Sequence, residues 1–335
     1  MAQLFGLILL SVLITAVLLV PFIDFLYRAK FRRVKQKTVD MFNKPTPTFD
    51  KFNNCKAGTP IGGGILIIAV VCILTFWAYG ILDIDIKGWE VMAIMLAFVG
   101  FGALGFYDDF KKMVNGRGVF FGLRFRHKFV IQWALALAVA CILYFQLGYS
   151  YIFIRGFGLA SLGYLFIPFA AFVIVAFANA FNIADGLDGL ASGLLLICLA
   201  AFLAITSNQL DQPLGIFIAV LMGSVGAFLY FNIYKARIWL GDVGALSLGA
   251  VLAVIGLLTG KVIALAFIGG VFIIEIASSL IQIVAKKFFR KKVFPVSPLH
   301  LLLRRIGWDE PKVVMRAWLL GFLFAILGLY IAFIQ

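Results

Sequence analysis

Residues 172–205 read FVIVAFANAFNIADGLDGLASGLLLICLAAFLAI, two apolar runs joined by a short polar turn. An α-helix needs about 20 apolar residues to cross a hydrocarbon core of about 30 Å, and each run lies within a stretch of that length. The runs are continuous rather than alternating, so they predict helices and not the strands of a membrane β-barrel. This stretch therefore predicts two membrane-spanning helices joined by a turn at one membrane face.

The same pattern continues along the whole chain. Of the 335 residues, 64% are hydrophobic and 13% are charged, and the mean hydropathy is +1.08. A soluble domain has only about 45–50% apolar residues, so the composition predicts one all-α, polytopic membrane domain over 1–335. Ten spans are expected, near 3–27, 61–82, 89–107, 129–147, 161–180, 189–207, 213–232, 245–260, 262–284 and 317–335.

The positive charges indicate how the spans are oriented. Connectors 28–60, 108–128, 233–243 and 285–316 hold all but three of the 29 Lys and Arg residues. Because cytoplasmic loops are enriched in Lys and Arg, these connectors are predicted to be cytoplasmic, and alternation of the spans adds 181–188 to them. Both termini are then expected outside. Topology and anionic lipid headgroups account for the net charge of +14, so nucleic acid is not expected as a partner.

Five clusters of polar residues lie at span ends on this predicted cytoplasmic face. They are 56–64 (KAGTPIGGG), 108–112 (DDFKK), 179–189 (NAFNIADGLDG), 241–249 (GDVGALSLG) and 298–308 (PLHLLLRRIGW). Ionisable residues at membrane depth are costly and usually functional. The clusters therefore predict an active site on one face of the membrane.

Five of the 15 acidic residues belong to these clusters, namely Asp108, Asp109, Asp185, Asp188 and Asp242. A single Asp at a helix start is explained by capping and by the helix dipole. Five at one face exceed what capping requires, and hard oxygen ligands shared with substrate phosphates are the usual surroundings of Mg²⁺. Cations available to the phosphates are Lys56, Lys111, Lys112, Lys128 and Arg304.

Three further residues attract attention. His300 lies in a basic stretch that is expected to face the same site. Trp239 offers a flat apolar surface that either stacks on a base or anchors the chain at the membrane interface. Glu275 lies within the ninth span, and a structural role is expected for it because Ser278 and Gln282 share its helix face.

Together these segments resemble the polyprenyl-phosphate N-acetylhexosamine-1-phosphate transferases. The resemblance follows the family's order from residue 56 to residue 318, in KAGTPIGGG, GFYDDFKK, GLRFRHKFVIQ, NAFNIADGLDGLASG, FNIYKARIWLGDVGALSLGA, GGVFIIEIASSLIQ and SPLHLLLRRIGWDEPKVVMRAW. The last stretch is more similar to the muramoyl-pentapeptide branch than to the N-acetylglucosamine-1-phosphate branch.

The resemblance implies ten membrane helices with both termini outside, in the bacterial cytoplasmic membrane, and an active site at the cytoplasmic face. It implies a Mg²⁺-dependent transfer of phospho-N-acetylmuramoyl-pentapeptide from UDP-N-acetylmuramoyl-pentapeptide to undecaprenyl phosphate, which releases UMP and forms lipid I. By motif it implies catalytic roles for Asp108, Asp109, Asp242 and His300. The positions that it matches to substrate binding are Lys56, Thr59, Lys128, Asn182, Asp185, Asp188 and Asn232.

Two positions depart from the family's pattern. The family's three consecutive histidines are His300-Leu301-Leu302 in this chain, and its GTPTMGG is GTPIGGG. Only the first histidine of that motif is therefore carried over.

A mechanism follows as a hypothesis. Asp242, with Asp109, is expected to hold Mg²⁺ against the donor pyrophosphate, while Asp108 deprotonates the lipid phosphate for direct attack. A two-step route through an aspartyl-phosphate is the rival. The residues expected to hold the substrate are Asp185, Asn182 and Trp239 at the uridine end and His300 and Arg304 at the phosphate or sugar end.

Two other functions stay open at this point. The first is transfer of N-acetylglucosamine-1-phosphate from UDP-N-acetylglucosamine to undecaprenyl phosphate, the reaction of the sister branch. The second is an ion-coupled membrane transporter, against which the one-sided acids and the lack of an internal repeat argue. The sequence does not specify the oligomeric state, and a homodimer is left open.

Overall fold

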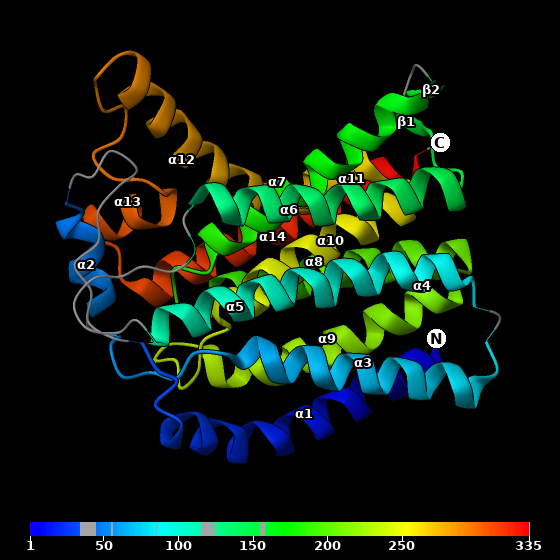
Figure 1. Ribbon diagram of the computed structural model, residues 1–335, viewed down its shortest axis with the longest axis horizontal. Coiled ribbons are helices and arrows are strands. Elements are labelled where there is room, and N and C mark those ends of the chain that lie inside the picture. Colours follow the sequence, from blue (N-terminus) through cyan, green and yellow to red (C-terminus); the bar gives the residue numbers. More distant parts are fainter. Residues whose placement is uncertain are drawn as a thin grey trace.

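The chain forms an elongated bundle of helices in the computed structural model (Figure 1), which describes residues 1–33, 45–54, 56–84, 86–114, 123, 125–154 and 158–334. Most helices run nearly along the long axis of the bundle, as expected where backbone polar groups must be satisfied within each span. The fold class predicted from composition, an all-α polytopic membrane protein, is confirmed.

Nine helices among the described residues are long and apolar enough to cross a membrane, and the number is ten if one bent pair of helices is counted as a single span. The nine are α1 (Ala2–Arg28), α3 (Gly63–Leu82), α4 to α5 (Gly88–Met95, Leu96–Gly100 and Phe101–Val114), α6 with its π-turn (Phe125–Cys141 and Ile142–Gln146), α7 with a short 3₁₀ start (Gly163–Leu165 and Phe166–Ala184), α8 (Leu190–Gln209), α9 (Gln212–Asn232), α10 (Gly241–Leu258) and α14 (Glu310–Phe333). The bent pair is α11 (Val262–Ile268) and α12 (Gly270–Phe288), which meet at an angle of 77°.

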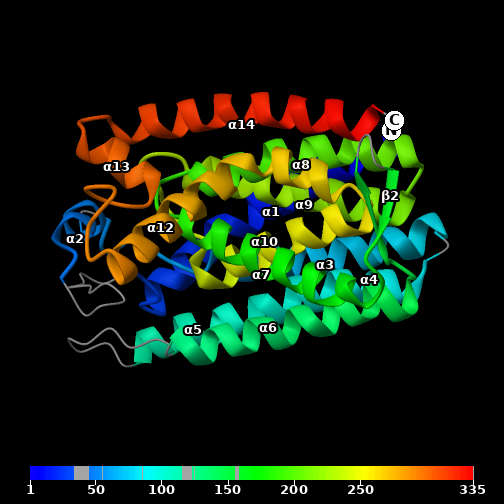
Figure 2. The same cartoon turned by 90° about the horizontal axis from the view of Figure 1, so that it is seen from above.

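Helix α10 lies at the centre of the bundle. Of its apolar stretch, 89% is buried inside the protein, against 28% for α1 and 22% for α14 at the periphery. It packs against α7, α5 and α3, and Figure 2 shows it between α14 on one side and α5 with α6 on the other. The residue that begins this central helix is therefore surrounded by segments from distant parts of the chain.

Glycines bring the first turn of α10 into close contact with its neighbours. A Cβ atom at Gly64 on α3 would lie 2.2 Å from the backbone nitrogen of Gly244, and one at Gly105 on α5 would lie 2.2 Å from the carbonyl oxygen of Asp242. Small residues of this kind let membrane helices approach until their backbones touch. The contacts place Asp242 directly beside the last turns of α5.

Several predicted boundaries were wrong. Helix α5 continues to Val114, α7 continues to Ala184 and α14 begins at Glu310, so the predicted connectors 108–128, 181–188 and 285–316 are shorter than expected. The prediction ended each span where charged or polar side chains begin, but a helix satisfies its own backbone and continues past that point. Asp108 and Asp109 consequently lie inside a helix rather than at its end.

The predicted connectors also contain structure of their own. Helix α2 (Pro47–Asn54) lies within 28–60, and α13 (Leu299–Arg305) lies within 285–316. At the other end of the bundle, β1 (Tyr151–Ile154) and β2 (Gly158–Ser161) pair as an antiparallel hairpin. The ninth predicted span is not one straight helix, because it breaks at Gly269.

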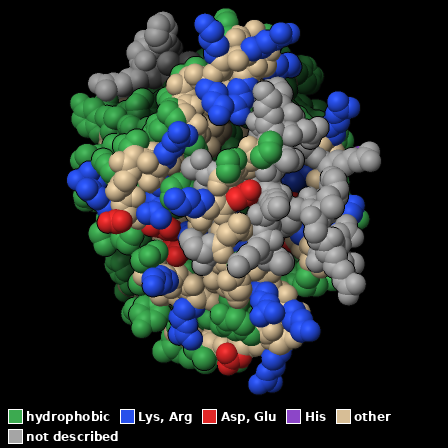
Figure 3. All heavy atoms as spheres, turned by 90° about the vertical axis from the view of Figure 1, so that its left-hand side faces the viewer, with side chains coloured by type: hydrophobic (Ala, Val, Ile, Leu, Met, Phe, Trp, Pro, Cys, Tyr) green, Lys and Arg blue, Asp and Glu red, His purple; other side chains and the backbone are tan. Residues whose placement is uncertain are grey.

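The two ends of the bundle differ in charge. The N- and C-termini lie at the same end, opposite α2 and α13 (Figure 1). Figure 3 views the end that carries α2 and α13, where Lys and Arg side chains surround a few Asp and Glu side chains. The grouping of both termini away from this basic end agrees with the predicted alternation of spans. The side of the membrane that each end faces stays a prediction.

Candidate active site

Asp242 occupies the first turn of α10, at the basic end of the bundle. A carboxylate there is favoured by the positive end of the helix dipole. Gly241 precedes it with a φ of 74°, a conformation that glycine adopts without strain. A Cβ at Gly241 would lie 2.6 Å from Oδ2 of Asp109, so glycine at this position also lets a second carboxylate approach.

Asp108 and Asp109 lie on the last turns of α5 and are 2% and 3% exposed. Both carboxylates accept hydrogen bonds from backbone amides of other segments. The N–H of Leu123 donates to Oδ1 of Asp108 at 2.6 Å, and the N–H of Val243 donates to Oδ2 of Asp109 at 3.3 Å. The second bond ties α5 to the start of α10.

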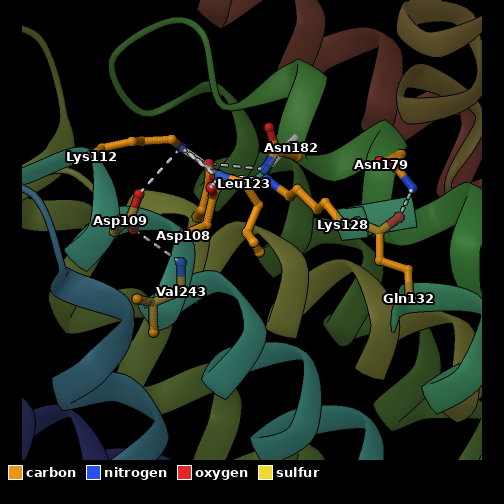
Figure 4. A network of polar contacts seen from close by, with 10 residues as sticks. Asp108, Asp109, Lys112, Leu123, Lys128, Gln132, Asn179, Asn182 and Val243 are labelled. Carbon is orange, nitrogen blue, oxygen red and sulfur yellow. Dashed lines mark hydrogen bonds and ion pairs between the residues drawn. The ribbon is translucent and has the colours of Figure 1, made fainter. Parts of the chain in front are cut away.

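Two lysines complete what we term the carboxylate–lysine cluster, formed by Asp108, Asp109, Lys112, Lys128 and Asp242. Figure 4 labels the first four of these residues. Nζ of Lys112 lies 2.7 Å from Oδ2 of Asp242, 3.0 Å from Oδ2 of Asp108 and 3.6 Å from Oδ1 of Asp109. Nζ of Lys128 lies 2.6 Å from Oδ2 of Asp242 and 3.0 Å from Oδ2 of Asp108. Three acids predicted from two separate motifs therefore converge around two ammonium groups.

The donor chemistry of this cluster fits a divalent cation. Among the residues that the structure describes, no group of three or more His, Cys, Asp or Glu side chains is arranged to hold a metal ion without other ligands. Mg²⁺ does not need one, because it is usually held by one or two carboxylates together with substrate phosphates and water. The ammonium of Lys112 lies within 4 Å of oxygens of Asp108, Asp109 and Asp242, so the three carboxylates already share one positive charge.

Asn182 and Asp185 extend the cluster from the end of α7. Nδ2 of Asn182 donates to Oδ1 of Asp242 at 3.1 Å. Burial raises the pKa of the Asp185 carboxyl well above its usual range, and the charges of Arg33 and Lys56 act in the opposite direction. Of the two residues predicted at the uridine end, Asn182 therefore contacts the predicted metal ligand directly.

A second group of charges, which we term the Lys56 brace, consists of Lys56, Asp188 and Glu310. Nζ of Lys56 contacts Oδ1 of Asp188 at 2.9 Å and also contacts Oε1 of Glu310. The N–H of Asp188 donates to Oε1 of Glu310 at 2.8 Å, and the N–H of Ala236 donates to Oδ2 of Asp188 at 3.0 Å. Four segments meet at this brace, so the predicted substrate residues Lys56 and Asp188 are bound to the protein itself here.

Trp239 is 4% exposed, and its ring is bordered by two cations. The guanidinium of Arg33 lies 5.0 Å from the ring centroid, and Nζ of Lys56 lies 4.7 Å from it. Stacking of a base on this ring stays a prediction, and it would require at least one of these cations to move.

Three other predicted substrate residues contact the protein backbone. Asn232 is buried and accepts from the N–H of Gly189 at 3.1 Å. The carbonyl of Thr59 accepts from the N–H of Arg33 at 2.9 Å. Nη1 of Arg304 donates to the carbonyl of Trp308 at 3.1 Å. Each of these hydrogen bonds holds a loop in place at the basic end of the bundle.

His300 and Glu275 form a buried pair. Nδ1 of His300 lies 3.0 Å from Oε2 of Glu275, and the two residues are 2% and 4% exposed. The expected structural role of Glu275 thus has a partner that the sequence analysis did not name. The structure places His300 at the basic end but next to Gly186 rather than in the carboxylate–lysine cluster.

Sequence reasoning did not name Arg33 or Glu310, and it named Lys112 only as a cation available to the phosphates and Glu275 only as a structural residue. The sequence does indicate that Lys112 contacts the acids, because it follows Asp108 by four residues and Asp109 by three and so shares their helix face. No sequence pattern indicates the contact of Glu310, since its partner Lys56 lies 254 positions away in the chain.

The model of glycosyl transferase family 4 matches residues 91–260, which include the whole carboxylate–lysine cluster. A phospho-N-acetylmuramoyl-pentapeptide-transferase of Geobacillus sp. strain WCH70 is 37% identical over 97% of this chain and 96% of its own length. The chain belongs to the phospho-N-acetylmuramoyl-pentapeptide-transferase family.

Other members of this family are similarly close. The phospho-N-acetylmuramoyl-pentapeptide-transferase of Bacillus licheniformis is 35% identical over 97% of this chain and 96% of its own length, and that of Desulforudis audaxviator is 39% identical over 82% and 84%. The family predicted from the motifs is confirmed. Membership makes the protein an enzyme, so the alternative of an ion-coupled transporter falls.

Proposed function

We propose that this protein transfers phospho-N-acetylmuramoyl-pentapeptide from UDP-N-acetylmuramoyl-pentapeptide to undecaprenyl phosphate, forms lipid I and releases UMP. One observation supports this most strongly: Asp108, Asp109 and Asp242 converge with two lysines at one end of an apolar bundle. The names of the relatives point to the same donor. They also favour this reaction over transfer of N-acetylglucosamine-1-phosphate.

The reaction joins two phosphates of like charge, so charge neutralisation is its main requirement. A phosphate oxygen of the lipid forms a bond to the sugar-bearing phosphorus of the donor, and the bond from that phosphorus to the oxygen of UMP breaks. Mg²⁺, which Asp109 and Asp242 would hold, would supply charge neutralisation at the pyrophosphate. Lys112 and Lys128 would add two ammonium groups to the same place.

Asp108 is the proposed general base. Lipid phosphate that still carries a proton would lose it to this carboxylate, and the oxygen freed in this way would attack. In the rival two-step route Asp108 itself attacks and becomes an aspartyl-phosphate, which the lipid phosphate then cleaves. The N–H of Leu123 and the two lysines hold the carboxylate in place for either role.

The substrates explain why such a site should lie at one end of a membrane bundle. The polyprenyl tail must stay in hydrocarbon while its phosphate meets a water-soluble nucleotide sugar. We place the site at the cytoplasmic face of the bacterial cytoplasmic membrane, because Lys and Arg surround it. The proposal holds for a monomer and for a homodimer alike.

A direct test offers the purified protein undecaprenyl phosphate and Mg²⁺ with either UDP-N-acetylmuramoyl-pentapeptide or UDP-N-acetylglucosamine. We expect UMP and a lipid-linked product from the first donor, and no UMP after addition of a chelator. Product from the second donor alone would assign the chain to the sister branch. Absence of UMP with both donors would reject the proposed reaction.

A further inference from the structure

Helix α12 holds the segment 293–300 through buried polar side chains on one of its faces. Oε1 of Gln282 accepts from the N–H of Phe294 at 2.9 Å, and its Nε2 donates to the carbonyl of the same residue at 2.8 Å. One turn closer to the break in the span, Oγ of Ser278 accepts from the N–H of Leu299 at 3.1 Å. These bonds fix the segment that leads into α13.

Glu275 is the last of these polar residues, and it fixes an imidazole. Its Oε1 accepts from the N–H of His300 at 3.2 Å, and its Oε2 lies 3.0 Å from Nδ1 of the same residue. A carboxylate beside Nδ1 keeps a hydrogen on that nitrogen and fixes the orientation of the ring. The opposite nitrogen, Nε2, must then point away from α12.

Nε2 points at Gly186. A Cβ at Gly186 would lie 2.5 Å from Nε2 and 3.0 Å from Cε1 of His300. The imidazole therefore fills the space that a side chain at position 186 would need. Gly186 lies between Asp185 and Asp188, so the ring contacts the loop that carries both acids.

We infer that Glu275 and His300 are positioning residues for the acidic loop 185–189. Helix α12 fixes the ring through Glu275, and the ring fixes the loop at Gly186, which sets where Asp185 lies relative to Asp242. His300 is 2% exposed and its two nitrogens face Glu275 and Gly186, so it acts through the loop and not on a phosphate. The inference rests on the proposed function, because that function makes Asp185 a donor-binding residue.

A double-mutant cycle tests this arrangement. The four proteins are the wild type, Gly186→Ala, His300→Ala and the double variant, assayed for the KM of the UDP-linked donor, the KM of undecaprenyl phosphate and kcat. Gly186→Ala forces the ring and the loop apart, so we expect kcat/KM for the donor to fall about tenfold, the effect of overpacking a fitted site. The KM for the lipid should stay unchanged.

The decisive comparison is between His300→Ala and the double variant, which both lack the imidazole ring. In the His300→Ala background the new methyl group meets no imidazole, so adding Gly186→Ala should change kcat/KM by less than about twofold. An equal loss in both backgrounds would overturn the inference. Gly226→Ala is the matched control, because a Cβ at this glycine of α9 would meet nothing within 4 Å.

Glu275 supplies a second arm in case Gly186→Ala does not accumulate in the membrane. Glu275→Ala should lower kcat/KM for the donor in the wild type and lower it less in the His300→Ala background, where only the bond to the backbone N–H of residue 300 is left to lose. Glu275→Gln keeps an oxygen that can accept from the ring and should restore part of the loss. Additive losses from Glu275→Ala and His300→Ala would reject the positioning role.

Melting temperatures separate this inference from the proposed function. Gly186→Ala should lower the melting temperature of the protein that contains His300 and not that of His300→Ala, whatever reaction the enzyme catalyses. If the wild type releases no UMP but this pattern appears, the proposed function fails and the positioning role stands. If UMP is released and the pattern is absent from both readouts, the positioning role fails alone.

Discussion

The carboxylate–lysine cluster and the Lys56 brace use the same residue types at the same end of the bundle, but they differ in access. In the first, the side chains of Lys112, Lys128 and Asp242 are 20%, 18% and 19% exposed, although those of Asp108 and Asp109 are 3% and 4% exposed. In the second, those of Lys56, Asp188 and Glu310 are 9%, 4% and 4% exposed. Ions that remain partly open to water can exchange one partner for another, whereas closed ions cannot without a large cost.

The two groups also differ in how their oxygens are used. Both oxygens of Asp188 and one of Glu310 are bound by Lys56 or by backbone N–H groups that come from other segments. Asp108 and Asp109 each accept from one backbone N–H, but Asp242 contacts the side chains of two lysines and an asparagine. Charge alone therefore does not identify an active site. The carboxylate–lysine cluster, and not the Lys56 brace, is suited to receive a metal and a pyrophosphate.

The largest effect is expected from Asp242→Ala. This change removes the carboxylate that both lysines share, so transfer should fall by about 10³-fold, as when a main electrostatic contact of a transition state is lost. The melting temperature should change less than in a variant of the Lys56 brace. UMP release and differential scanning fluorimetry measure the two quantities.

Asp24→Ala is the control for this prediction, because Asp24 is an exposed acid on α1. It should retain wild-type transfer. Normal UMP release by Asp242→Ala would show that the carboxylate–lysine cluster is not the site of reaction. The functional distinction between this cluster and the Lys56 brace would then be wrong.

The Lys56 brace should respond in the opposite manner. Glu310→Ala leaves Lys56 with a single carboxylate and the N–H of Asp188 without an acceptor. Breaking a buried ion pair costs about 3–5 kcal/mol, so we expect a large fall in melting temperature. Protein that stays folded at low temperature should keep much of its activity.

Asp309→Ala is the matched control, since Asp309 is exposed and its side chain makes no capping hydrogen bond at the start of α14. Little change in melting temperature is expected there. A Glu310→Ala protein that is fully stable yet inactive would place the brace in the catalytic machinery instead.

The acids of the candidate site can be singled out in the sequence because each lies in a short motif. The positions of Asp108, Asp109 and Asp242 follow from their place at span ends, and the alternation of spans brings them to one face. Their mutual contact depends on Gly105 and Gly241, whose missing side chains allow α5 and α10 to touch. Such complementarity between distant helices is not visible in a local pattern.

The long-range partners could not be predicted. Glu275 shares a helix face with Ser278 and Gln282, and this pattern suggested that they pair with one another. In the fold, all three instead bind the backbone of 293–300. This segment follows α12 in the chain and lies back against the same helix. A helical pattern specifies which side chains share a face, not which segment covers that face.

A smaller effect is expected from Lys112→Met. The ammonium of Lys112 lies among the oxygens that would hold Mg²⁺, so it competes with the metal in the absence of substrate. One charge at this distance changes the affinity for another cation by about tenfold, so Mn²⁺ should bind the variant about tenfold more tightly. Turnover should fall at the same time, because the pyrophosphate loses a positive neighbour.

Electron paramagnetic resonance of free Mn²⁺ measures the affinity with the purified protein alone. Lys111→Met is the control: Nζ of Lys111 lies 6.0 Å from the ring centroid of Tyr107 rather than in the cluster, so its Mn²⁺ affinity should match the wild type. Weaker Mn²⁺ binding by Lys112→Met would mean that the lysine supports the metal instead of competing with it.

The smallest effect is expected at Trp239. Its ring borders the Lys56 brace, so substitutions here test whether the brace is separate from the donor site. Each cation beside an aromatic face contributes about 0.5–1 kcal/mol, so Trp239→Leu should lower the melting temperature slightly, while Trp239→Phe should keep part of this stability. If the ring serves only Arg33 and Lys56, the KM for the UDP-linked donor should be the same in both variants. A KM that rises with Leu and recovers with Phe would instead mean that the cations move aside for a base, and the brace would then belong to the donor site.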